Sequence, residues 1–98
     1  MGARISIAFK KGDQKSVALF SHWGGTEFAD GAREYVKELK EERKGQTMPL
    51  DRFEPDTVMV DFIRHATKDL KRVESDLYLG KDENDGDNSD YGHADIEL

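Results

Sequence analysis

The chain has 98 residues and no cysteine, which suits one small domain and excludes disulfides, thiolate metal sites and cysteine nucleophiles. No apolar run approaches the roughly 18 residues of a membrane span, and the N-terminal segment lacks a signal-peptide core, so we expect a cytoplasmic protein without membrane association. Basic and acidic residues balance over residues 1–80 and form no Lys/Arg cluster, which argues against nucleic acid as a partner. The net charge of −6 arises in residues 81–98 and favours a basic protein or a cation as partner.

The first predicted element is an antiparallel hairpin. Residues 3–9 (ARISIAF) alternate in polarity and place Ile5, Ile7 and Phe9 on one face, which is typical of a half-buried strand. Residues 11–14 (KGDQ) form a turn, and residues 15–21 (KSVALFS) are apolar enough for a strand that is buried on both faces.

A first helix follows the break at residues 21–25 (SHWGG), with Thr26 as its N-cap and Gly45 as its stop. Its apolar stripe consists of Phe28, Ala32, Tyr35, Val36 and Leu39. Gly31 lies inside this helix, where glycine costs about 1 kcal/mol relative to alanine. We therefore expect Gly31 to make a close contact with the hairpin.

A second helix follows a loop that contains Pro49, and Pro55 suits its first turn. Its stripe continues to about Val73 and comprises Val58, Met59, Phe62, Ile63, Ala66, Leu70 and Val73. Two amphipathic helices of this kind can cover one face of a sheet.

Two short alternating segments end the chain, at residues 76–79 and 93–98. If they pair, the acidic loop at about residues 81–90 joins a second hairpin. The predicted order is then β-β-α-α-β-β. We predict a single α+β domain over residues 1–98, with a mostly antiparallel four-stranded sheet and two helices on one face.

The acidic loop contains a partial calcium-loop pattern. Asp85, Asp87, Ser89 and Asp90 supply oxygen ligands at D-x-D-x-S spacing around a glycine, which favours a hard cation such as Ca²⁺. The EF-hand pattern fails, because its twelfth position is Ile96 instead of glutamate. A solvated turn uses the same residue types, so that alternative stays open.

A second candidate site is the segment His22, Trp23, Gly24 and Gly25. Two glycines allow a sharp turn after a strand, where ligand contacts collect. Either Trp23 covers the edge of the core, or these residues bind a ligand or partner together with free N–H groups of the following helix, which would attract an anion.

The stretches LFSHWGG and GDNSDYGH together resemble small uncharacterised prokaryotic and phage proteins. In these, a strand ends in an HW(D/G)G motif and the chain closes with an Asp-x-Gly-His segment. The resemblance implies a shared fold and no particular activity.

These observations favour binding over catalysis. Our leading hypothesis is a small interaction protein whose acidic loop binds Ca²⁺. The alternative is an acidic protein–protein module that uses the loop and Trp23 without metal. A third hypothesis is a metal-dependent hydrolase that uses His22 and His93 with Asp90. Ser21 and His22 are adjacent on a strand and point to opposite faces, so they cannot form a nucleophile–base pair.

Overall fold

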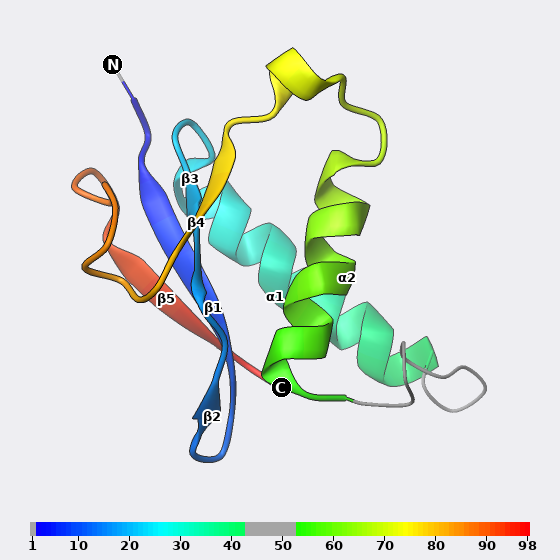
Figure 1. Ribbon diagram of the computed structural model, residues 1–98. Coiled ribbons are helices and arrows are strands. Elements are labelled where there is room, and N and C mark those ends of the chain that lie inside the picture. The colour runs from blue at the N-terminus through cyan, green and yellow to red at the C-terminus, as the bar shows by residue number, and fades with distance from the viewer. Residues whose placement is uncertain (1, 43–52) are drawn as a thin grey trace.

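A computed structural model describes residues 2–42 and 53–98 of the chain. It shows a five-stranded sheet with two helices packed against one face (Figure 1), which confirms the predicted α+β class. The elements are β1 (Ile5–Lys11), β2 (Gln14–Lys15), β3 (Ala18–Ser21), α1 (Gly25–Glu42), α2 (Pro55–Thr67), the 3₁₀ turn η2 (Arg72–Glu74), β4 (Leu77–Gly80) and β5 (His93–Glu97). Neither described helix has the length and apolar character that crossing a membrane requires.

The N-terminal hairpin forms as predicted, but β1 is buried on both faces and not half-buried as expected. β1 pairs antiparallel with both β2 and β3, and Gly12 turns the chain with a φ of 61°. Ser16 separates β2 from β3 because its hydroxyl, not its carbonyl, accepts the hydrogen bond of the Phe9 N–H, at 2.9 Å. Val17 then points outward, whereas all residues of β3 are buried.

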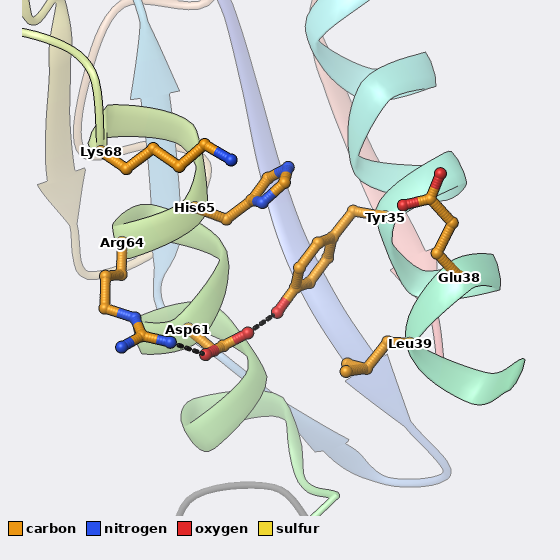
Figure 2. Close-up of a pocket in the computed structure, with 7 residues that line it drawn as sticks. All are labelled: Tyr35, Glu38, Leu39, Asp61, Arg64, His65 and Lys68. Carbon is orange, nitrogen blue, oxygen red and sulfur yellow. Dashed lines mark hydrogen bonds and ion pairs between the residues drawn. The ribbon is translucent and has the colours of Figure 1, made fainter. Parts of the chain in front are cut away.

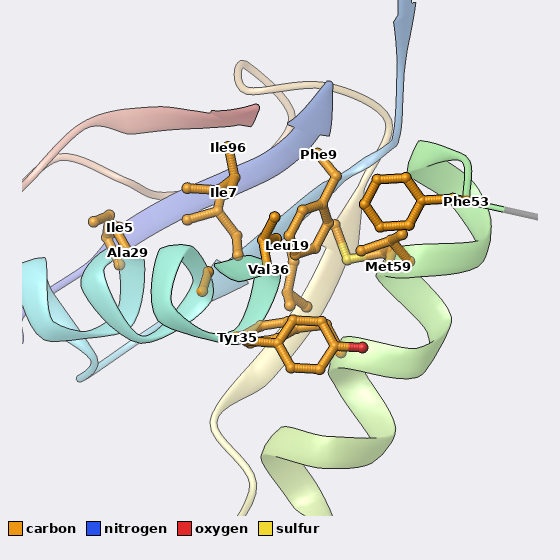
Figure 3. Packing of buried hydrophobic residues seen from close by; sticks show 13 residues of the cluster. Ile5, Ile7, Phe9, Leu19, Ala29, Tyr35, Val36, Phe53, Met59 and Ile96 are labelled. Atoms are coloured by element: carbon orange, nitrogen blue, oxygen red, sulfur yellow. The ribbon is translucent and has the colours of Figure 1, made fainter. Parts of the chain in front are cut away.

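The main core lies between the sheet and the two helices (Figure 3). Phe62 of α2 is its centre, since its ring contacts those of Phe9 and Tyr35 edge-on at centroid distances of 5.5 and 5.2 Å. The other core side chains come from both predicted helical stripes and from three strands, and they include Ile5, Ile7, Leu19, Ala32, Val36, Val58, Met59 and Ile96.

The second helix is shorter than predicted. It ends at Thr67, whose hydroxyl donates to the Ile63 carbonyl at 2.7 Å, and the Leu70 N–H then bonds to the Thr67 carbonyl at 3.0 Å. This turn directs the chain back to the sheet, so the expectation of a helix to Val73 is wrong. Leu70 lies beyond the helix, and its side chain is exposed.

Two details of the first helix also differ from expectation. α1 begins at Gly25, so Thr26 lies inside the helix and is not its N-cap. Gly31 is exposed, and a Cβ there would meet nothing within 4 Å, so the expected contact with the hairpin is wrong. The predicted stop at Gly45 and the loop around Pro49 lie outside the described residues.

The predicted second hairpin is wrong. β4 pairs antiparallel with β3, while β5 pairs in parallel with β1, so that the order across the sheet is β5-β1-β3-β4. Alternation predicts a half-buried strand but not its neighbour. The connection between these two strands, residues 81–92, therefore runs from one edge of the sheet to the other, and we call it the strap (Figure 1).

The strap covers the face of the sheet opposite the helices. Phe20 stacks on Tyr78 of β4 with centroids 5.0 Å apart, and Gly86 lies against both rings. Further along, the Asn88 side-chain amide donates to the Ser6 hydroxyl at 2.9 Å. Phe20 and Ser6 are fully buried as a result. The acidic segment is thus part of the packed fold and not the tip of a hairpin.

Candidate functional site

The two sequence motifs lie on either side of the chain segment that leads into β1. On one side, the Ala3 N–H donates to the His22 carbonyl at 3.0 Å and the Gly25 N–H donates to the Ala3 carbonyl at 2.8 Å. The turn at residues 21–25 is therefore bonded directly to the start of the chain.

The end of the strap is bonded to the other side of this segment. The Tyr91 N–H donates to the Arg4 carbonyl at 2.9 Å, and the Ser6 N–H donates to the Gly92 carbonyl at 3.0 Å. Residues 87–93 and 21–25, which are far apart in the sequence, thus meet at one end of the sheet.

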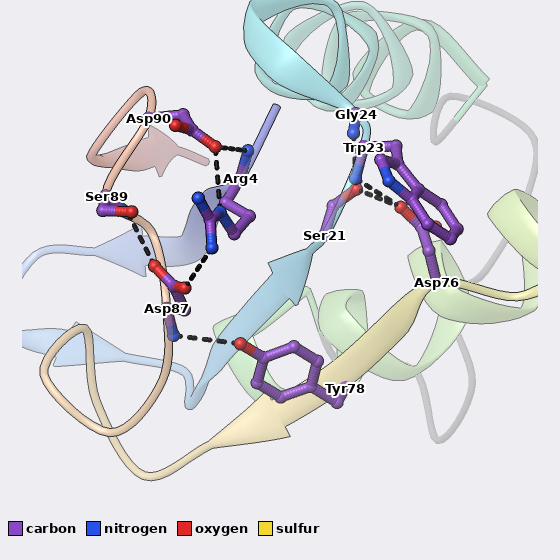
Figure 4. A network of polar contacts seen from close by, with 9 residues as sticks. All are labelled: Arg4, Ser21, Trp23, Gly24, Asp76, Tyr78, Asp87, Ser89 and Asp90. Atoms are coloured by element: carbon purple, nitrogen blue, oxygen red, sulfur yellow. Dashed lines mark hydrogen bonds and ion pairs between the residues drawn. The ribbon is translucent and has the colours of Figure 1, made fainter. Parts of the chain in front are cut away.

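Arg4 binds two acidic residues of the strap, Asp87 and Asp90 (Figure 4). Its Nη1 lies 2.7 Å from Asp87 and its Nε 2.9 Å from Asp90, and its backbone N–H also donates to Asp90. Hydrogen bonds from the Arg4 side chain and backbone lower the pKa of Asp90. The pKa of Asp87 is lowered first by the Ser89 N–H and then by Arg4. Both groups are therefore stabilised as carboxylates by internal partners.

The predicted metal ligands do not converge on a common point in this arrangement. Asp87 and Asp90 bond to Arg4, whereas Asp85 accepts a hydrogen bond from the Lys81 N–H at 2.9 Å and Ser89 donates its N–H to Asp87 at 3.1 Å. Among the described residues there is no group of three or more His, Cys, Asp or Glu side chains placed to hold a metal ion. A cation would have to displace the Arg4 guanidinium, and calcium binding stays a prediction.

His93 belongs to a hydrogen-bonded chain beneath the strap. Its Nδ1 lies 2.7 Å from the Ser6 hydroxyl and its Nε2 lies 2.8 Å from Asp95. Because a carboxylate only accepts, Nε2 carries a proton, and Nδ1 of the neutral ring accepts from Ser6. Burial alone raises the pKa of Asp95, but the hydrogen bonds from Lys15 and His93 together outweigh burial, so the pKa is lowered overall. Asp95 is therefore stabilised as a carboxylate.

The hydrogen-bonded series Ser6–His93–Asp95 has the residue types of a hydrolytic triad, but its serine is not accessible to a substrate. Ser6 is fully buried under Asn88, so a substrate cannot reach its hydroxyl in this arrangement. His22 packs edge-on against Trp23 instead of joining His93, whose two ring nitrogens are both engaged. A metal ion bound by His93 would have to replace its hydrogen bond to Ser6 or to Asp95. The metal-dependent hydrolase stays a prediction.

The turn at residues 21–25 fixes the backbone of Trp23 (Figure 4). Asp76 accepts hydrogen bonds from the Ser21 hydroxyl at 2.8 Å and from the Trp23 N–H at 2.9 Å. The Gly24 N–H donates to the Ser21 hydroxyl, and a Cβ at Gly24 would lie 2.6 Å from that oxygen. The amides of Gly24 and Gly25 are thus bonded inside the protein, which leaves the side chain of Trp23 as the exposed feature.

Trp23 is 65% exposed and lines one end of a shallow apolar groove. This part of the groove has a volume of about 320 Å³ and also contains Phe28, Leu70 and Leu77. Leu70 and Leu77 continue into a second hollow of about 410 Å³ between β4 and the end of α2. Sequence analysis missed this groove, because the helix was expected to cover it to Val73.

A separate cleft of about 500 Å³ separates α1 from α2 (Figure 2). The Tyr35 hydroxyl bonds to Asp61 across it, the His65 ring packs against Tyr35 at a centroid distance of 5.2 Å, and Arg64 reaches Asp61 at 3.4 Å. The two contacts of Tyr35 join α1 to α2, whereas Arg64 and Asp61 both belong to α2, so we assign the cleft a role in packing.

Comparison of the chain with protein-family models, curated proteins and solved structures finds no match. The resemblance carried by the two motifs therefore stays a prediction, and the site is interpreted from its own geometry.

Proposed function

We propose that this protein is a small interaction module that binds another protein through the groove beside Trp23. The observation that carries the proposal is the exposed ring of Trp23, the only tryptophan of the chain, on a backbone held by Asp76. An exposed tryptophan on a rigid turn loses little conformational entropy when a partner covers it. Tryptophan is also among the residues that contribute most to protein interfaces.

The groove supports a contact at this side of the molecule more than at the strap. Apolar side chains gather along it, including Leu70 and Leu79, which are both exposed. The carboxylates of Asp87 and Asp90 on the strap are already paired with Arg4. A basic partner for the strap stays a prediction, whereas the groove offers apolar area that a partner can bury.

Site-specific photocrosslinking tests the proposal, because it captures a partner whose identity is still open. A benzoylphenylalanine at position 23 should give discrete crosslinked products in cells that produce the protein, and addition of a chelator to extracts should not remove them. In the matched control, benzoylphenylalanine replaces Val60, whose side chain on α2 is 68% exposed. Equal product patterns at both positions, or no product at position 23, would refute a specific contact at Trp23.

A further inference from the structure

β4 forms one edge of the sheet and has an open side. It pairs only with β3 among the described strands. The bond from the His22 N–H to the Asp76 carbonyl identifies the hydrogen-bonded positions of this antiparallel ladder. Since these positions alternate, Tyr78 and Gly80 bond toward β3, while Leu77 and Leu79 direct their backbone groups outward. The Leu77 N–H meets the Ser75 hydroxyl at 3.4 Å, in agreement with this assignment.

The two edges of the sheet differ in their protection against a further strand. β5, at the opposite edge, carries Asp95 and Glu97, and charges on an edge strand disfavour pairing with another chain. β4 has the sequence LYLG and carries no charge. Its edge therefore lacks the charged side chains that would disfavour an added strand.

The groove lies directly beside this open edge. Leu77 and Leu79 point to the helix side of the sheet, but the end of α2 stops short of them, and Leu79 is 56% exposed. Ile63 and Leu70 line the opposite side of the hollow. A strand added to β4 would place every second side chain over these apolar residues.

The charge of the hollow beside β4 selects the occupant, because basic residues line it and no acidic residue of the described chain does. Lys71 and Arg72 line it, and neither makes an ion pair in residues 2–42 and 53–98. Glu74 and Asp76 line the other part of the groove, beside Trp23, where Asp76 accepts from the Ser21 hydroxyl and Glu74 from the Lys71 N–H. An occupant with carboxylates among its apolar residues would complement the two free cations.

We propose that β4 binds an extended peptide segment by strand addition, and that the face of the segment over the groove carries both apolar side chains and acidic side chains, the latter near Lys71 and Arg72. This inference rests on the proposed function and specifies its partner. A second copy of the chain fits less well. Paired through β4, it would present Leu77, Leu79 and Lys81 on the groove side and bring a like charge to the basic rim.

The test uses the fluorescent nine-residue peptide Val-Thr-Glu-Thr-Val-Thr-Glu-Thr-Val, in which Val and Glu share one face of the strand, and fluorescence anisotropy as the readout. The control peptide has Lys in place of Glu. Two variants separate the side chain of Leu79 from its backbone. Leu79→Ala keeps the outward N–H, whereas Leu79→Pro removes this N–H and leaves the hydrogen bonds to β3 intact. Edge strands tolerate proline at such an outward position. We expect L79P to bind the Val/Glu peptide about tenfold more weakly than L79A, and V60A to match the wild type.

A charge reversal gives a second, independent test that does not depend on the proline. The double variant K71E/R72E should lose affinity for the Val/Glu peptide and gain affinity for the Val/Lys peptide. The inference is overturned if L79A and L79P bind equally, if the reversal changes neither affinity, or if sedimentation shows that β4 forms a dimer of the chain. Absence of Val/Glu binding together with specific crosslinking at position 23 would reject strand addition while leaving the interaction module intact.

Discussion

Replacing Gly86 with alanine should destabilise the protein, because no space exists for a methyl group beneath the strap. A Cβ at Gly86 would lie 2.8 and 2.9 Å from two atoms of the Phe20 ring and 2.9 Å from the Tyr78 ring. The two rings are stacked, Phe20 is fully buried, and the Tyr78 hydroxyl accepts the Asp87 N–H at 2.9 Å. Neither ring can move without breaking these contacts, so the strap must lift.

Overpacking of this kind costs about 1–3 kcal/mol. In a domain of this size, each kcal/mol lowers the melting temperature by about 4–8 °C. Gly86 does not have a positive φ, so the effect is steric and not a matter of backbone strain. Circular dichroism followed through urea and thermal unfolding gives both quantities.

Gly31→Ala is the matched control for this substitution. It adds the same methyl group to an exposed helical position with nothing within 4 Å, and it should stabilise the protein by about 0.5–1 kcal/mol. If Gly86→Ala is as stable as the wild type while Gly31→Ala behaves as expected, the strap is not packed on Phe20 and our interpretation of the second face is wrong.

Two further substitutions test the polar contacts of the strap. Folding lowers the pKa values of Asp87 and Asp90, so the two carboxylates stabilise the protein above their unfolded pKa of about 3.9, and this stabilisation is lost as the pH falls. Arg4→Gln should therefore be less stable than the wild type at neutral pH, and the difference should disappear in acid. Unfolding midpoints measured down to about pH 2 will show this. The same variant removes the guanidinium from both carboxylates, so if the strap holds Ca²⁺ its affinity for Ca²⁺ should rise. Amide shifts that saturate only outside the strap would contradict calcium binding there. Ser6→Ala removes the partner of His93 Nδ1 in a buried site and should cost about 1–3 kcal/mol, with a change in the imidazole nitrogen shifts of His93; unchanged stability and shifts would show that this bond is absent.

Much of the fold follows from local patterns in the sequence. The hairpin is predicted by the alternation of residues 3–9 and by the turn at Gly12, and the two helical stripes contact the core as far as Leu39 and Ala66. The end of α2 was not predictable from the stripe, because Leu70 continues the apolar spacing although the helix has already ended at Thr67.

The partners of the last two strands could not be predicted, since alternation is the same whichever strand lies alongside. As a consequence, the first strand was expected to be half-buried, whereas the strap buries Ser6 on its second face. His93 and Asp95 are two residues apart on a strand and therefore share a face, so their contact could have been expected from spacing alone. The third member, Ser6, required the parallel pairing of β1 and β5.

The candidate site shows the same limit. The D-x-D-x-S spacing points to a cation, but the cation that the structure provides is Arg4, which lies 83 and 86 positions before its two partners. Trp23 was a candidate contact residue in one of two alternatives and its side chain is exposed, while the groove beside it depends on where α2 ends.

Residue-resolved hydrogen exchange of the free protein tests the account most directly, because it asks whether the strap is fixed and whether the edge of β4 is open. We predict slow exchange for the amides of Tyr78, Gly80 and Gly92 and fast exchange for Leu79. Strap amides that exchange as in an unfolded chain, or a Leu79 amide as protected as that of Tyr78, would contradict the closed second face and the open binding edge.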